Sequence, residues 1–333
     1  MNEVKNKAIR FHELGGPEVL KLEEVEVGLP KTNELRIRVE AVALNRAEAL
    51  FRNGQYLVKP KLPSLICAEG AGIVDKVGEG IEGIKEGDRV CIIPSGMPGA
   101  YGICGEMAIV PMASVIPAPK EFSVLEAASV WVQYSTALAL VEYGKLSLGN
   151  YVIIPAASSS IGIAAIQVCN WAGAVPIAVT RSRSKVAELK KHGAKHVIVT
   201  DEDNLVEEVM RITNGKGAEI VFDCVAGPYV ETLVQAMAEE GILFVYGELS
   251  GEPTPHPHSV IARKRISQTG FTAYSIWEHP ERFSRVKDLI IRGLSEGKLK
   301  PLIDKTFTLA QVVEANQYAE SNQQIGKIII KIT

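Results

Sequence analysis

The sequence lacks an excess of positive charge. Its 333 residues include 36 lysines and arginines against 39 aspartates and glutamates, a formal net charge of −3. Non-specific binding to nucleic acid needs a surplus of cations to neutralise phosphates, so the composition predicts no nucleic-acid partner. The chain also lacks repeats and low-complexity tracts. Hydrophobic residues make up 47% and charged residues 23% of it, which is typical of a globular protein and excludes a mainly disordered one.

Cysteine is scarce. The number is odd and no two cysteines form a CxxC pair, whereas disulfide frameworks and structural zinc sites need denser or paired spacing. The first residues, 1–7, are polar and contain no apolar signal segment. We therefore expect a cytoplasmic protein with reduced thiols. The five cysteines are Cys67, Cys91, Cys104, Cys169 and Cys224.

Long charge-free runs are also rare, with one exception between Leu146 and Thr180. This stretch is longer than the roughly 20 residues that span a bilayer. However, it is interrupted by Pro155, by the serines 158–160 and by Pro176. Buried strands of a parallel sheet also form continuous apolar runs. We interpret the stretch as a strand, a helix and a second strand, and expect no membrane segment.

The sequence pattern changes near residue 120. Up to about residue 120, short Val- and Ile-rich runs such as 7–11, 35–42 and 71–77 are separated by Gly, Pro and Asp, a pattern typical of a β-barrel or sandwich. Ser123 and Glu126 then form a capping-box signature for a helix start. From 151 to 246, strands and helices alternate, which predicts a doubly wound parallel sheet.

A candidate dinucleotide site follows the strand predicted at 151–155. The usual GxGxxG glycines fall on Ala157, Ser159 and Gly162, and only the last is glycine. The segment nevertheless lies after a strand and before a helix, where unpaired N–H groups and the helix dipole favour a pyrophosphate. The alternative is a plain tight turn between a strand and a helix.

The end of the second strand discriminates between cofactors. A site for NADH has an acidic residue there, about 20 residues after the glycine motif, to bind the ribose 2′-OH. Residues 179–183 contain no acid, but Arg181, Arg183 and Lys185 follow Thr180. Guanidinium groups can pair with a 2′-phosphate, so the sequence favours NADPH. The alternative is that these cations are solvated at the start of a helix.

Several motifs match one family. Residues 68–90 read AEGAGIVDKVGEGIEGIKEGDRV, and the segments GEMA at 105–108 and QIGK at 324–327 also fit. The chain resembles the medium-chain dehydrogenase/reductase superfamily, in its zinc-lacking quinone oxidoreductase branch. The resemblance implies a GroES-like β-barrel domain at 1–122 and 271–333 and a Rossmann domain at 123–270. It also implies a homodimer formed through the edge of the Rossmann sheet.

The resemblance also bears on zinc. Zinc-using members hold the metal with Cys, His and a later Cys or Asp, and the corresponding positions here are Asn45, Ala68 and about Val132. Alanine and valine cannot bind zinc, and an amide is a poor zinc ligand. We therefore expect no metal. A relocated site at His256 and His258 would instead make the protein a zinc-dependent alcohol dehydrogenase.

Without a metal, hydride transfer favours an acceptor that spreads the developing charge, such as a quinone or an α,β-unsaturated carbonyl. The resemblance places Asn45 and Tyr56 in the substrate pocket as hydrogen-bond donors, although they could instead be a helix cap and a half-buried aromatic. Arg46 and Glu48 are expected at the surface. The interpretation is an NADPH-dependent, zinc-independent reductase of such small molecules. A further alternative is a non-catalytic NADPH-binding protein like the lens crystallins of this family.

The remaining expected cofactor contacts combine the charge pattern with the resemblance. They lie in the helix after the capping box, the glycine-motif loop, the ends of strands two, four and five, and the C-terminal segment. Tyr134 fits a helix core equally well, and Glu69 is expected to be structural. The contacts are Thr136, Ser159, Ser160, Ile161, Thr180, Arg181, Arg183, Lys185, Val225, Tyr246, Gly247 and Lys327.

Overall fold

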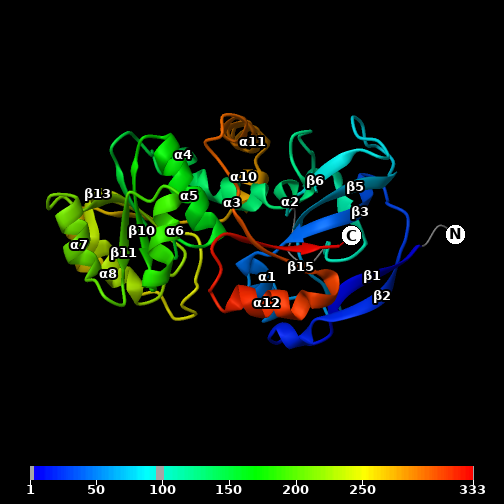
Figure 1. The fold of residues 1–333 in the computed structure, drawn as a ribbon, viewed down its shortest axis with the longest axis horizontal. Helices are drawn as coiled ribbons and strands as arrows, with labels where there is room; N and C mark the ends of the chain where they lie inside the picture. The colour runs from blue at the N-terminus through cyan, green and yellow to red at the C-terminus, as the bar shows by residue number, and fades with distance from the viewer. Residues whose placement is uncertain (1–3, 95–100, 333) are drawn as a thin grey trace. The chain divides into compact units, whose positions relative to one another are not determined.

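The computed structural model describes residues 4–94 and 101–332 and contains two compact units. The first consists of Met1–Val132 with Ile303–Thr333, and the second of Gln133–Leu302. They combine a β-rich unit with a unit built on a parallel sheet, as the sequence predicts, and many of their elements are labelled in Figure 1.

The first unit is built on a seven-stranded sheet with the order β15-β16-β3-β5-β6-β8, in which β7 also pairs with β3. A second sheet has the order β2-β1-β4. The C-terminal strand β16 lies antiparallel to β3, so that Ile329 faces Ala43. The strands are β1 (Val4–Phe11), β2 (Lys21–Val27), β3 (Glu34–Ala43), β4 (Ser64–Leu65), β5 (Glu69–Val77), β6 (Arg89–Ile92), β7 (Met107–Pro111), β8 (Val115–Pro117), β15 (Ile303–Thr308) and β16 (Lys327–Lys331).

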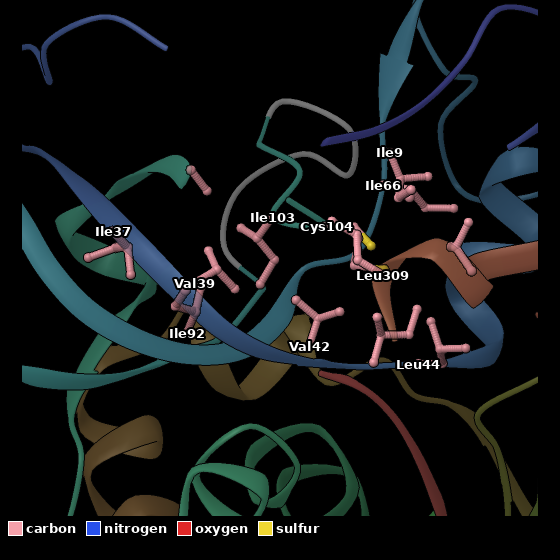
Figure 2. Packing of buried hydrophobic residues seen from close by; sticks show 14 of the residues in the cluster. Ile9, Ile37, Val39, Val42, Leu44, Ile66, Ile92, Ile103, Cys104 and Leu309 are labelled. Atoms are coloured by element: carbon pink, nitrogen blue, oxygen red, sulfur yellow. The ribbon is translucent and has the colours of Figure 1, made fainter. Parts of the chain in front are cut away.

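The described part of this unit also contains the helices α1 (Arg46–Arg52), α2 (Val124–Ala127) and α12 (Val312–Glu320). The core contains apolar side chains from β1, β3, β6 and the turn before α12, several of which are labelled in Figure 2. Removing this apolar surface from water stabilises the fold by roughly 25 cal/mol per Å². The core also fixes the ends of β3 and β16, from which the polar groups described below emerge.

The second unit contains a six-stranded sheet with the order β11-β10-β9-β12-β13-β14. All its strand pairs are parallel. The strand order reverses between β9 and β12, and this switch point is where open α/β sheets bind ligands. The strands are β9 (Tyr151–Ile154), β10 (Val175–Thr180), β11 (His196–Val199), β12 (Ala218–Asp223), β13 (Met237–Val245) and β14 (Ser267–Gly270).

The helices of this part of the chain include several that sequence periodicity did not separate. The helix start predicted at Ser123 leads into three short helices, α2, α3 and α4, and α9 begins directly after the proline-rich segment 253–257. They are α3 (Val130–Ala137), α4 (Ala139–Glu142), α5 (Ser160–Trp171), α6 (Val186–Lys191), α7 (Leu205–Ile212), α8 (Tyr229–Ala236), α9 (His258–Lys264), α10 (Tyr274–Trp277) and α11 (Pro280–Ser295).

The charge-free stretch forms β9, α5 and β10, with most of α5 buried. The interpretation as strand, helix and strand is therefore confirmed. Among the residues that the structure describes, no helix is both long and apolar enough to cross a bilayer.

The observed division differs from the expected boundaries, because residues 271–302 belong to the second unit. In this unit, β14 pairs with β13 and continues the parallel sheet. The segment beyond β14 is then held there by polar contacts: Arg285 donates to Glu142 over 2.8 Å and the Tyr143 hydroxyl to the Ser275 carbonyl over 3.2 Å. A composition shift could not reveal these tertiary contacts.

Candidate active site

The loop between β9 and α5 has the geometry of a phosphate-binding turn. Ala156 has a positive φ of 46°, which lets the chain turn sharply at the end of β9. Ser159 caps α5 by accepting a hydrogen bond from Gly162 N over 3.0 Å. A Cβ atom on Gly162 would lie 2.5 Å from the Ala157 carbonyl oxygen, so only glycine fits there without a backbone shift.

This loop places two predicted contacts, Ser160 and Ile161, in the first turn of α5. The first N–H groups of a helix have no intrahelical acceptor, and the helix dipole adds positive potential. The residues present therefore fit a pyrophosphate. Ala157 and Ser159 replace two glycines of the usual fingerprint without filling the turn, because the tightest position remains Gly162.

The cations after β10 take different partners. The Lys185 ammonium donates to the Ser158 hydroxyl over 2.9 Å, beside the phosphate loop. Arg183 instead forms an exposed ion pair with Glu202, while Arg181 is exposed. Thr180 is buried at the strand end. The structure thus brings Lys185 to the expected phosphate region and gives Arg183 a competing carboxylate.

The carboxyl ends of β12 and β13 form the next part of this edge. The Asp223 carboxylate accepts hydrogen bonds from Val225 N over 2.8 Å and Ala226 N over 3.0 Å. Burial raises the pKa of Asp223 to about 6, although these two N–H donors oppose the shift. Tyr246 N binds the Asp223 carbonyl over 2.8 Å and so joins the two strand ends.

The last predicted contacts of this unit are Gly247 and Thr136. A Cβ atom on Gly247 would lie 2.9 Å from the Cys224 carbonyl oxygen, so the chain passes closely there. Thr136 is buried in α3. Tyr134 is also buried, and its hydroxyl donates to Gln167 over 2.9 Å, which supports its place in the helix core.

A second polar group lies in the first unit, where β3, β5 and β16 meet. Lys327 and Glu69 form a buried ion pair of 2.8 Å, with side chains 1% and 0% exposed. The Lys327 ammonium also donates to Asn45 Oδ1 over 2.6 Å, and Asn45 Nδ2 donates to Glu69 Oε2 over 3.1 Å. The other Glu69 oxygen accepts from Val132 N over 2.9 Å. We call Asn45, Glu69 and Lys327 the amide cluster.

The expected role of Lys327 changes as a result. The resemblance suggested that it binds a cofactor phosphate, but its buried ammonium lies against Glu69 and Asn45. Removing a charge from water is costly unless the charge is paired. This pairing therefore occupies the side chain within the first unit.

Glu48 corrects a second expectation. It is 8% exposed rather than at the surface, and its carboxylate accepts a hydrogen bond from the backbone N–H of Asn45, the residue before α1. Burial raises the pKa of Glu48 to about 7, and nearby Glu69 adds to the rise, while hydrogen bonding to Asn45 and the Lys327 charge oppose it. The Asn45–Glu48 spacing is that of a capping box, a signal that sequence analysis could have used.

Tyr56 is half-buried against the core of the same unit. Burial and then the Glu48 charge raise the pKa of its hydroxyl, so this group stays protonated at neutral pH. Glu48 thus affects both expected donors: its carboxylate accepts a hydrogen bond from Asn45 N–H, and its charge raises the pKa of Tyr56.

The positions that the resemblance assigns to zinc ligands hold Asn45, Ala68 and about Val132. The rings of His256 and His258 lie 6.1 Å apart. Among residues 4–94 and 101–332, no group of three or more His, Cys, Asp or Glu could hold a metal ion.

The two units match known domains. Residues 31–120 match the model of the alcohol dehydrogenase GroES-like domain, and residues 160–292 match that of the zinc-binding dehydrogenase. The quinone oxidoreductase of Rattus norvegicus is 28% identical over 327 residues, 97% of each chain.

The chain belongs to the medium-chain dehydrogenase/reductase superfamily, in its quinone oxidoreductase-like branch. It is an oxidoreductase of this superfamily. The quinone oxidoreductase of Pseudomonas syringae has a similar structure, with a TM-score of 0.91 and 27% identity, covering 98% of this chain and 100% of the other. That of Escherichia coli in complex with NADPH has a TM-score of 0.90 and 26% identity, with the same coverage. The Escherichia coli protein thus binds NADPH with this fold.

Proposed function

We propose that the protein is an NADPH-dependent reductase of quinones or α,β-unsaturated carbonyls that works without zinc. The observation that carries this proposal is the amide cluster. Asn45, which the resemblance sets at the position of a zinc ligand, accepts a hydrogen bond from the Lys327 ammonium 2.6 Å away. The Asn45 oxygen is therefore already occupied by the ammonium, and Ala68 and Val132 offer a zinc ion no ligand atom.

The second unit contains the residues that would bind the cofactor. Ser159, Ser160 and Ile161 at the start of α5 would hold the pyrophosphate, while Arg181 and Lys185 would bind the 2′-phosphate. NADPH, when bound, supplies the hydride. The Escherichia coli relative in complex with NADPH supports this cofactor.

The first unit contains the hydrogen-bond donors that would act on the substrate. Reduction of a conjugated carbonyl places negative charge on the substrate oxygen, and a preorganised hydrogen-bond donor stabilises that charge. The Asn45 amide and the Tyr56 hydroxyl are such donors. A saturated alcohol would also require removal of its proton, for which a Lewis acid is the usual aid, so the donors favour quinones and enones.

Turnover tests the proposal. Purified protein is mixed with NADPH and a panel of 1,2-quinones, 1,4-quinones and enones, and the nicotinamide absorbance is followed, with NADH in parallel. We expect oxidation of NADPH with at least one class, unaffected by a chelator. Tight NADPH binding without turnover on any member would favour a non-catalytic role. Stoichiometric zinc, lost together with activity on chelation, would favour an alcohol dehydrogenase.

Cofactor choice is tested with Arg181→Asp. Losing a charged hydrogen-bonding partner costs about 1.5–3 kcal/mol, so the dissociation constant for NADPH should rise roughly 10- to 150-fold while that for NADH stays the same. Arg263→Asp makes the same charge change on the exposed face of α9 and serves as the matched control. Equal affinity of the unmodified protein for NADH and NADPH would contradict the assignment.

We also propose that the protein is a cytoplasmic homodimer. All five cysteines are buried free thiols, which suits a reducing compartment. In the second unit, β14 forms an edge of the parallel sheet and each of its residues is exposed, so it offers unpaired backbone groups to a second copy. Light scattering should give the mass of a dimer, and Gln268→Pro in β14 should give a monomer; a monomeric unmodified protein would contradict the proposal.

A further inference from the structure

The orientation of the Asn45 amide is fixed by the chemistry of its neighbours. An ammonium only donates hydrogen bonds and a carboxylate only accepts them. Asn45 Oδ1 must therefore face Lys327, at 2.6 Å, and Nδ2 must face Glu69, at 3.1 Å. A flipped amide would set N–H against ammonium and oxygen against carboxylate, so only one orientation is stable.

The two N–H groups of this amide are unequally held. Besides its bond to Glu69, Asn45 Nδ2 has only long contacts with other acceptors, 3.4 Å to the Ala43 carbonyl and 3.5 Å to Glu48 Oε1. Hydrogen bonds of this length are weak. One N–H can therefore turn to a stronger acceptor at little cost, while the other keeps the amide in place.

Asn45 is also the most exposed member of the amide cluster. Its side chain is half-buried, whereas Lys327 and Glu69 are almost completely buried. The backbone adds rigidity, because Leu44 N donates to the Ile328 carbonyl over 3.0 Å and so ties the end of β3 to β16. The buried charges of Lys327 and Glu69 therefore affect solvent or substrate through the Asn45 amide.

A cation bound to the amide oxygen strengthens the amide as a donor. It draws electron density toward Oδ1 and leaves the N–H groups more positive, the usual polarisation along a chain of hydrogen bonds. The low-dielectric surroundings increase this effect. Glu69 balances the charge of Lys327, so the polarisation does not require an unpaired buried ion.

We propose that Lys327 is a positioning residue for hydride transfer, which orients and polarises the Asn45 amide so that its loosely held N–H stabilises the negative charge developing on the substrate oxygen. This inference rests on the proposed function. Hydride adds to the acceptor carbon of the quinone or enone, and the π electrons shift to the carbonyl oxygen, leaving NADP⁺ and an enolate, which in the case of a quinone tautomerises to the hydroquinone after protonation. Water then gives a proton to this product, while Asn45 keeps its own protons.

The decisive variant is Lys327→Met combined with Glu69→Gln. Lys327→Met alone would leave the Glu69 charge buried and unpaired and could unfold the protein, whereas the double variant removes both charges. Circular dichroism and a thermal melt should show a folded protein. We expect kcat for a quinone to fall at least about tenfold, with the dissociation constant for NADPH within about twofold of the original. Lys327→Arg keeps a cation, so its kcat should lie between that of the double variant and that of the unmodified protein.

A spectroscopic measurement tests the polarisation without turnover. The side-chain amide of Asn45 is assigned in a ¹H–¹⁵N spectrum through its disappearance in Asn45→Asp. Its two protons should resonate far apart and downfield in the unmodified protein, and move upfield in the double variant. This result does not depend on any substrate, so failure of the quinone assay and failure of this inference can be distinguished.

Two outcomes would overturn the inference. The first is a folded double variant with unchanged kcat and an unchanged Asn45 amide signal. The second is a raised dissociation constant for NADPH with kcat preserved at saturation. That result would indicate that Lys327 binds a cofactor phosphate instead.

Discussion

Glu48→Gln should change how the stability of the first unit depends on pH. Glu48 is 8% exposed, and burial raises its pKa from 4.5 to about 7. Glutamine keeps the oxygen that accepts the N–H of Asn45, so the helix start remains capped. The substitution therefore removes the titration while keeping the local structure.

The sign follows from proton linkage. Between pH 4.5 and about 7, the folded protein holds a proton on Glu48 that the unfolded chain has already lost. Stability must then fall as pH rises through this range and become level above it. At 1.36 kcal/mol for each pKa unit, the whole loss is about 3 kcal/mol. Glu48→Gln does not suffer this loss, so relative to the unmodified protein it should gain about 3 kcal/mol at pH 8.

The assay is urea denaturation at several pH values from 4 to 8, with the difference in unfolding free energy between Glu48→Gln and the unmodified protein plotted against pH. Taking the difference cancels the other titrating groups. Asp223→Asn in the second unit is the matched control, since the pKa of Asp223 is raised to about 6 and its difference should level off at lower pH. A Glu48→Gln difference that is constant with pH would refute the reasoning.

Three further substitutions test the loop and the buried charges. Gly162→Ala would place a methyl group 2.5 Å from the Ala157 carbonyl oxygen, so it should cost about 1–3 kcal/mol in denaturation and weaken NADPH binding in calorimetry; an unchanged protein would contradict the tight turn. Ala156→Gly relieves a positive φ of 46° and should stabilise by up to about 1 kcal/mol, whereas a loss would show that the conformation carries no strain. Arg52→Met removes a buried guanidinium from its 2.6 Å pair with Glu320, whose side chain is 26% exposed, and should cost about 1–3 kcal/mol; adding Glu320→Gln should recover part, and no recovery would argue against the charge pair.

The second unit was predictable because its signals are local. The alternation of strands and helices, the charge-free stretch and the segment leading to Gly162 each arise from neighbouring residues, and the structure contains the corresponding β9, α5 and β10. The cations after β10 were also visible in sequence. Their partners were not, because Glu202 and Ser158 approach Arg183 and Lys185 only when separate parts of the sheet come together.

The first unit shows the limit of such reasoning. The resemblance predicts that Asn45 and Tyr56 line the substrate pocket, but Glu48 was expected at the surface and Lys327 among the cofactor contacts. Burial of Glu48 depends on how α1 packs, which its short sequence does not specify. The pairing of Lys327 depends on β16 returning to lie beside β3.

The sequence by itself determined the class of each unit and the helix start that suits a phosphate, since both follow from residue type and short spacing. The family resemblance, rather than spacing, indicated that Asn45, Ala68 and about Val132 stand at the positions of the usual zinc ligands. The tertiary structure decided which charges neutralise one another. Asn45 and Lys327 are 282 positions apart in the chain but 2.6 Å apart in space, and electrostatic energy depends on distance in space and on burial, neither of which residue order alone provides.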